Sequence, residues 1–262
     1  MSWSGKERFQ AVNSWPKDRE SLTFVRMNNI HPIHPRDSSM PQSIRMTMVR
    51  SLGVAGLVCF ASTLFDVATL AAEDGFVKIF DGKSLEGWEG DLKTFRVVDG
   101  AIVAGTLDAK IPRNEFLCTR KRYANFELRL EARLRGPGEN AGIQFRSERI
   151  PNHHEVIGYQ CDMGTAQGKS IWGALYDESR RRIFLAQGDH DQLVTKLKKD
   201  DFNNIVIRCE GNRIRIWVND LLTVDYEEKE GGIATRGVIG LQIHGGEPGE
   251  ATYREIRILE LP

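Results

Sequence analysis

The stretch NFELRLEARLRG, residues 125–136, alternates apolar and charged side chains along its length. Glutamate or arginine separates its apolar residues, which are Phe126, Leu128, Leu130, Ala132 and Leu134. Side chains on a β-strand alternate between its two faces, so this segment predicts a strand with one face on a core and the other in water. That pattern is typical of a strand in an outer sheet that packs against a second layer.

Similar short segments occur on both sides of this strand. FRVVDGAIVAG (95–105) predicts a hairpin that turns at Asp99-Gly100. NNIVIRCEGNRIRIWVNDLLTVDY (203–226) predicts three strands with turns at Gly211-Asn212 and Asn219-Asp220. Strands at intervals of about 8 to 12 residues, with little helical periodicity, predict an all-β fold: a two-sheet antiparallel β-sandwich or jelly roll. We expect one such domain over residues 73–262.

Three segments place paired polar side chains on one face of a strand that is otherwise apolar. The segments are AGIQFR (141–146), GYQCDMG (158–164) and GLQIHGG (240–246), and the pairs are Gln144 with Arg146, Gln160 with Asp162, and Gln242 with His244. Burying amides and charges without partners costs several kcal/mol, so we expect these side chains to line a groove that binds a polar ligand. Sugars are the obvious class.

The first 72 residues differ from the rest of the chain. Residues 1–44 show no strand or helix period, and we expect a disordered or non-native extension there. Residues 45–72 have the layout of a secretory signal peptide: two arginines, then the apolar run SLGVAGLVCFASTLF, then small residues. Met40, Met46 or Met48 would each be a sensible start, with cleavage near Ala71 or Ala72. We therefore expect an exported protein, periplasmic or extracellular.

A single membrane anchor is the alternative to a signal peptide, but a run of about fifteen apolar residues is shorter than the roughly 20 that a span needs. We expect no stable membrane insertion after cleavage. Without residues 1–72, which hold 8 Lys/Arg and 5 Asp/Glu, the chain keeps 28 basic and 31 acidic residues, a net charge of −3. This balance does not favour nucleic acid as a partner. The three remaining cysteines are expected to be buried thiols, with at most one disulfide.

Four motifs, read in order, carry a resemblance to a known family. FDGKxLxGW spans Phe80–Trp88, NAGIxFR spans Asn140–Arg146, a GY strand spans Gly158–Met163, and LQxH spans Leu241–His244. The set resembles the 3-keto-disaccharide hydrolase domain family over essentially all of the chain from Phe76 to Leu261. The resemblance implies a concanavalin A-like jelly roll. Cys161 departs from the family pattern but is expected to point away from the groove.

The resemblance also implies an activity: cleavage of the glycosidic bond of 3-keto-glycosides or 3-keto-disaccharides, by hydrolysis or by elimination and hydration. A ketone at C3 acidifies the C2 hydrogen, so this chemistry needs a base, an acid near the leaving oxygen, and donors or a metal ion for the enolate oxygen. His244 or Asp162 is expected as the base, and substrate-binding roles are expected for Arg146, Gln144, Gln160, Trp172, Tyr176 and Gln242.

Each of these residues also has a purely structural interpretation. Arg146 is either a ligand or carboxylate clamp or a solvated arginine, and Asp162 is a site residue, a turn residue or the partner of Arg146. A lone histidine is more often structural than catalytic, but His244 is expected to share a strand face with Gln242, which makes it a candidate site residue. Trp172 and Tyr176, four residues apart and on one face if extended, are either a sugar platform or part of the core.

The cofactor is left open, and a divalent metal ion is one option. The loop RIPNHHEVIG contains His153, His154 and Glu155, but adjacent histidines on a strand would point to opposite faces, which disfavours a shared ion. No second acid stands at strand spacing from Asp162, which argues against ordinary glycosidase chemistry. A non-catalytic carbohydrate-binding module of lectin type is the alternative function, because the same fold serves both uses.

Overall fold

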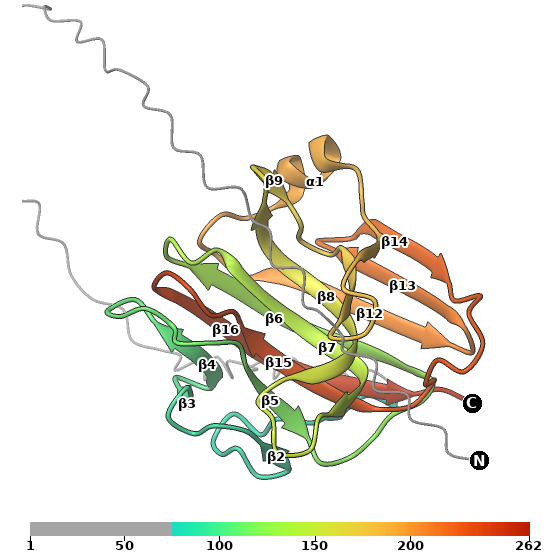
Figure 1. Cartoon of the computed structure of the whole chain (residues 1–262), viewed down its shortest axis with the longest axis horizontal. Helices are drawn as coiled ribbons and strands as arrows, with labels where there is room; N and C mark the ends of the chain where they lie inside the picture. Colours follow the sequence, from blue (N-terminus) through green and yellow to red (C-terminus); the bar gives the residue numbers. More distant parts are fainter. Residues whose placement is uncertain (1–74) are drawn as a thin grey trace, which may run out of the picture. The chain divides into compact units, whose positions relative to one another are not determined.

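The structure is a computed structural model and describes residues 75–262. The expected signal peptide and N-terminal extension lie outside the described residues. Within them the chain forms two antiparallel sheets and one short helix, α1 (His190–Lys196), so the predicted all-β sandwich is confirmed (Figure 1). No helix among residues 75–262 is long and apolar enough to cross a membrane.

The two sheets have eight strands each. In spatial order the first sheet, called sheet A here, contains β14 (Leu221–Glu227), β13 (Arg213–Val218), β12 (Asn203–Glu210), β6 (Phe126–Arg135), β16 (Gly249–Glu260), β4 (Ala101–Thr106) and β3 (Phe95–Val98), with β1 (Val77–Lys78) on β16. Sheet B contains β11 (Phe184–Ala186), β10 (Leu175–Glu178), β8 (Val156–Ala166), β7 (Asn140–Arg149), β15 (Val238–Ile243), β5 (Glu115–Thr119) and β2 (Trp88–Glu89), with β9 (Lys169–Ser170) on β8.

The predicted strand at 125–136 is β6, which lies in the middle of sheet A. Its apolar residues are buried, and the arginines between them are partly exposed. Arg129 pairs with Glu127 and Arg135 with Glu250, while the guanidinium of Arg133 lies over the ring of Phe202. The predicted hairpin is also present: Asp99 and Gly100 both have positive φ, 49° and 76°, as a tight turn between β3 and β4 requires. Local alternation and turn chemistry therefore predict these elements correctly.

The core lies between the sheets and contains the apolar residues of the three strands with polar pairs. Ile143, Phe145, Tyr159, Cys161, Leu241 and Ile243 all face it and are at most 1% exposed. Phe145 and Tyr159 stack with ring centroids 5.7 Å apart. All three cysteines of residues 75–262 are buried and free, as expected. Gln144, Gln160, Asp162 and Gln242 alternate with these core residues and consequently lie on the face of sheet B that points away from sheet A.

A buried tyrosine connects the two sheets directly beneath that face. Tyr253, on β16 of sheet A, donates its hydroxyl to the backbone carbonyl of Gln242 at 2.6 Å, and the carbonyl of Gly142 lies 3.2 Å from the same oxygen. Gly142 and Gln242 are paired across β7 and β15. This contact fixes the height of the two strands over the core and so positions their polar side chains.

The opening motif of the family resemblance is a structural turn. The Asp81 carboxylate accepts hydrogen bonds of 2.7 Å from the backbone amides of Lys83 and Ser84, and Gly82 has φ +77°. Trp88 at the end of the motif is buried and donates its indole N–H to the carbonyl of Ile79 at 2.8 Å. These residues close the edge of the sandwich and lie outside the polar face of sheet B.

Candidate functional site

Two neighbouring rows of residues cross the outer face of sheet B. The register pairs place Tyr176, Gln160, Gln144, Gly240 and Cys118 in one row, across β10, β8, β7, β15 and β5. The next row contains Asp162, Gly142, Gln242 and Phe116. We call this surface the polar face. It brings together five of the predicted site residues: the three glutamines, Asp162 and Tyr176.

A continuous chain of hydrogen bonds runs along the polar face. The Ser147 hydroxyl donates to Gln144 Oε1 (2.7 Å), Gln144 Nε2 donates to Gln160 Oε1 (2.6 Å), and Gln160 Nε2 donates to Asp162 Oδ1 (2.5 Å). All four side chains are at most 4% exposed. Because each amide uses its oxygen as acceptor and its nitrogen as donor, the chain has one direction, and it ends on the carboxyl group of Asp162.

Two glycines leave the space that these side chains occupy. A Cβ on Gly142 would lie 2.6 Å from Cδ of Gln160, and one on Gly240 would lie 3.1 Å from both Sγ of Cys118 and Cβ of Gln144. Neither glycine has a positive φ, so their role is steric and not conformational. Larger residues here would displace the Gln144–Gln160 pair.

Asp162 has the most strongly perturbed acidity on this face. Burial raises the pKa of its carboxyl from 3.8 to about 8, against the hydrogen bond from Gln160, which lowers it, while the nearby charge of Glu178 raises it further. Burial also raises the pKa of Glu178, and repulsion from Glu155 adds to that effect. The site therefore holds a carboxyl group whose pKa lies near neutral pH, which is the property that acid–base catalysis needs.

Gln242 is the one residue of the polar face with an orphaned side chain. It is fully buried, and among residues 75–262 neither its Oε1 nor its Nε2 has a hydrogen-bond partner. Leaving a buried amide unsatisfied costs about 1–3 kcal/mol, so such a group calls for an explanation. A ligand that both accepts from and donates to an amide would satisfy it.

His244 lies at the rim of the polar face and not on it. The residue follows the last residue of β15, its side chain is exposed, and Nδ1 lies 2.6 Å from the carbonyl oxygen of Gly245. It borders an open pocket of about 610 Å³ together with Asn114, His154 and Glu155. Asn114 connects this rim, because its Oδ1 accepts from the amide of Gly245 (2.9 Å) and its Nδ2 donates to Glu155 (3.3 Å).

Arg146 does not share the polar face, and the expectation from strand alternation is wrong for this residue. The register between β7 and β8 shifts between Phe145 and Glu148, and Arg146 takes φ +47° at this bulge. Its guanidinium donates to the carbonyls of Ala124 (2.8 Å) and Gly211 (2.7 Å) and to Asn125 Oδ1 (3.2 Å). It is a buried structural clamp for two loops and does not pair with Asp162.

Trp172 and Tyr176 do not form one platform. Trp172 lies in a turn in which Ala174 N–H donates to the carbonyl of Ile171 (3.0 Å) and Gly173 has φ +71°, so the segment is not extended there. Tyr176 pairs with Gln160 across β10 and β8, and its ring meets Phe184 edge-on with centroids 5.1 Å apart. Only the tyrosine belongs to the polar face.

The two adjacent histidines also differ from the expectation. His153 and His154 lie in a loop, and their rings stack with centroids 4.4 Å apart, so they do not point to opposite faces. His154 Nδ1 lies 3.0 Å from the carbonyl oxygen of Asn114. Among residues 75–262 no three His, Cys, Asp or Glu side chains gather in a way that could hold a metal ion.

Sequence reasoning missed two residues of the site. Ser147 enters the polar face because the bulge at Arg146 shifts the alternation by one residue. Glu178 pairs with Gly158 across β10 and β8 and so stands beside the row that starts at Tyr176. The same two-residue spacing that selected Gln160 and Asp162 would have selected Tyr176 and Glu178 in LYDE.

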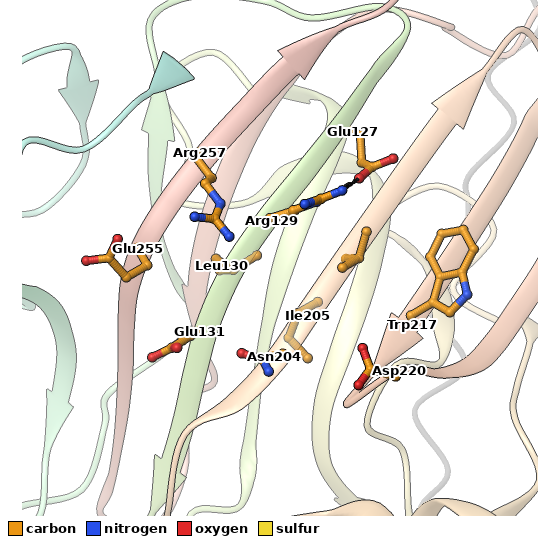
Figure 2. A pocket seen from close by; sticks show the side chains of 11 residues that line it. Glu127, Arg129, Leu130, Glu131, Asn204, Ile205, Trp217, Asp220, Glu255 and Arg257 are labelled. Carbon is orange, nitrogen blue, oxygen red and sulfur yellow. Dashed lines mark hydrogen bonds and ion pairs between the residues drawn. The ribbon is translucent and has the colours of Figure 1, made fainter. Parts of the chain in front are cut away.

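The outer face of sheet A differs from the polar face in chemistry. Its pocket of about 480 Å³ is bordered by Glu127, Arg129, Glu131, Trp217, Glu255 and Arg257 (Figure 2). Charges of both signs alternate there, and Glu127 pairs with both Arg129 and Arg208. Most of these charges are exposed or partly exposed, so the pairs contribute little individually.

Comparisons with solved structures agree with the two-sheet sandwich fold. A proposed glycosyl hydrolase from Parabacteroides distasonis ATCC 8503 superposes with TM-score 0.54 at 18% identity, covering 72% of this chain and 94% of that one. A protein of unknown function with a galectin-like fold from Bacillus subtilis gives 0.50 at 9% identity, covering 71% and 98%. The carbohydrate recognition domain of Emp46p, in a potassium-bound form, gives 0.51 at 10% identity, covering 69% and 92%. At these identities the likeness shows the fold alone.

A search of the curated proteins returned no match to this chain. The model of one protein family, by contrast, matches residues 75–259, which is nearly all of the described domain. The match covers the sandwich from its first strand to Leu259 in β16, including the polar face and its rim. The chain therefore belongs to the family of 3-keto-alpha-glucoside-1,2-lyase-like domains.

Proposed function

We propose that this protein is an exported enzyme that cleaves the glycosidic bond of sugars carrying a ketone at C3. The observation that supports this most directly is the polar face: a one-directional chain of hydrogen bonds that ends on a carboxyl group with a pKa near 8, beside an amide without a partner. Family membership supports the substrate class.

In this proposal Asp162 is the base that removes the acidified hydrogen at C2. A carboxylate with a pKa of about 8 is a stronger base than an ordinary aspartate, and Gln160 Nε2–H stabilises it once it is ionised. The electron pair of the C2–H bond moves into the C2–C1 bond while the C1–O bond breaks, and the leaving oxygen takes a proton. Water then adds across the C1–C2 double bond: its oxygen bonds to C1, it gives up a proton to the ionised Glu178, and protonated Asp162 returns a proton to C2, which gives the free 3-keto sugar.

Two further groups have roles that follow from their chemistry. Glu178, whose pKa burial raises, is the acid that protonates the leaving oxygen. The Gln242 amide hydrogen-bonds sugar oxygens and orients the ring over Asp162. His244 and the Asn114–Glu155 pair border the open pocket next to the end of β15, and in this proposal they contact the leaving group. A divalent ion would supply charge stabilisation at the enolate oxygen, and the proposal does not require one.

The test is to incubate the full chain with 3-keto-trehalose or a 3-keto-glucoside, with and without chelator, and to identify products by mass spectrometry. We expect a released sugar from the wild type and a loss of at least a hundredfold in rate for Asp162→Asn. Asp225→Asn, an exposed position on β14 of sheet A, is the matched control and should keep full activity. If no product forms either with or without chelator, the proposed enzymatic activity is refuted.

The second candidate is a carbohydrate-binding module without catalysis. It is favoured by the fold shared with the carbohydrate recognition domain of Emp46p and by the orphaned amide of Gln242, which suits binding as well as catalysis. The same variants separate the two. A binding module should retain its affinity for the keto sugar when Asp162 becomes Asn, and it should release no product.

A further inference from the structure

A further pocket lies beside α1 and β9, the two elements at the top of Figure 1. Its volume is about 400 Å³, within the range of ligand sites. Both sheets contribute to its walls: Leu134 and Asn203 come from sheet A, and Gly164 and Thr165 come from β8 of sheet B. It shares no residue with the polar face.

Trp172 is the aromatic residue that lines this pocket, and a hydrogen bond to the backbone of the next residue holds its turn in place. The hydroxyl of Thr223, on β14, donates to the carbonyl of Gly173 at 2.9 Å. A Cβ on Gly173 would lie 2.5 Å from the same hydroxyl oxygen, so the turn packs closely on sheet A. The indole is partly buried, packs against the core between the sheets and borders the pocket, so it presents an apolar surface to whatever enters.

His190 supplies a donor in a defined tautomer. The backbone N–H of Ser170 donates to its Nδ1 at 3.1 Å, so in the neutral ring the proton must lie on Nε2. Ser170, His190 and Trp172 all line the pocket. The pocket is thus lined by both an apolar ring surface and an N–H donor, and the hydrogen bond from Ser170 N–H orients the imidazole.

The loop at residues 198–201 forms another wall of this pocket and is held in place by the side chain of Asn203. The Asn203 side chain, 1% exposed, donates to the carbonyls of Lys198 and Asp201 at 3.0 Å and accepts from Lys198 N–H at 2.9 Å. This loop carries charges of both signs, with Lys198 and Lys199 beside Asp200 and Asp201. A mixed-charge wall does not select an ion of one sign, and it offers both donors and acceptors to a neutral hydroxylated ligand.

We propose that this pocket is a second carbohydrate site that binds a neutral, unoxidised pyranose unit. A pyranose presents one apolar face of C–H groups, which packs on an indole, and hydroxyls around its edge, which bind donors and acceptors. The site would hold a neighbouring unit of a glycan or a second sugar molecule. It does not depend on catalysis at the polar face, because a sugar without the C3 ketone is its ligand.

The experiment titrates maltose, trehalose and cellobiose into the full chain and follows the indole N–H signals by NMR. We expect a shift of the Trp172 signal, with dissociation constants in the millimolar range. Trp172→Ala should weaken binding at least tenfold, measured by calorimetry, and His190→Ala by severalfold. Trp217→Ala, a partly buried tryptophan on the outer face of sheet A (Figure 2), is the matched control and should bind normally.

Asp162→Asn separates this proposal from the catalytic one, since it should abolish turnover of the keto sugar and leave maltose binding unchanged. The pocket proposal is overturned if none of the three sugars shifts the Trp172 signal, if Trp172→Ala binds like the wild type, or if Asp162→Asn or Trp217→Ala removes the binding instead. Circular dichroism checks that Trp172→Ala is folded, and His190→Ala provides an independent reading if it is not.

Discussion

Replacing Asp162 by asparagine should make the protein more stable at neutral and alkaline pH while removing its proposed activity. The carboxyl is buried, and its pKa is raised from 3.8 to about 8 mainly because burial disfavours the charged form. Above pH 4 the unfolded chain releases the proton that the native state keeps. Native stability contributed by this group therefore falls as pH rises from about 4 to about 8 and is level outside that window.

The size of the effect follows from the pKa difference. Each pKa unit corresponds to about 1.4 kcal/mol, so the roughly four units between the two states amount to a native-state cost of about 6 kcal/mol above pH 8 and about 4 kcal/mol at pH 7. Asparagine is neutral at every pH and keeps an Oδ1 acceptor for Gln160 Nε2. The new amide N–H groups offset part of the gain, since burying them costs about 1–3 kcal/mol.

Urea unfolding at pH 4.5, 6, 7 and 8 measures this directly. The free energy of unfolding of Asp162→Asn relative to the wild type should rise steadily across the series, while Asp225→Asn should show no such trend. A stability difference between Asp162→Asn and the wild type that is the same at all four pH values would refute the reasoning, because it would mean that the native carboxyl titrates like an exposed one. A constant m-value confirms that the two unfolded states are comparable.

Three further predictions concern rate, packing and acid stability. If Asp162 is the base, kcat/KM for a 3-keto-glucoside should rise with pH and level off above about 8, and a profile that falls over this range would instead make the residue an acid. Gly142→Ala should cost about 2 kcal/mol, measured by urea unfolding, since its Cβ would lie 2.6 Å from Cδ of Gln160; Gly231→Ala, with open space around it, is the control and should cost less than 1 kcal/mol. Glu228 is buried, which alone would raise its pKa, but hydrogen bonds from Arg181 and Tyr159 outweigh burial and lower the pKa to about 2. The free energy that the ionised Glu228 contributes to the native state is therefore present above about pH 4.5 and lost toward pH 2. Glu228→Gln should accordingly destabilise the protein by about 2–3 kcal/mol at pH 7, with a gap to the wild type that closes in acid; a gap independent of pH would contradict the assigned ion pair.

The ion pairs of Arg181 include one partner that is close in sequence and one that is distant. The arginine run at 180–182 follows Asp177 and Glu178 along the chain, a spacing that favours local pairing. Asp177 is fully buried and does pair with Arg180 and Arg181. The second partner of Arg181, Glu228, is 47 residues away along the chain, so no local pattern identifies it.

The strands and one face of the site could be predicted from the sequence by itself. Side-chain alternation is a local property of extended backbone, so the burial of Ile143, Cys161 and Leu241 and the common face of Gln144, Gln160 and Gln242 follow from spacing alone. The turn at Asp99-Gly100 is equally local, because its residues tolerate the positive φ that the hairpin needs. Family motifs added the sugar chemistry that spacing does not carry.

The tertiary structure alone decided which residues near those strands belong to the site. The bulge beside Arg146 exists because β7 pairs with β8 in a shifted register, and it turns the guanidinium to distant carbonyls while placing Ser147 on the polar face. Because the chain turns at Trp172, its indole borders the pocket near α1 and β9 and does not lie on the polar face. The pKa of Asp162 is likewise a tertiary property, because desolvation depends on every atom packed around the carboxyl, and those atoms come from parts of the chain far apart in sequence.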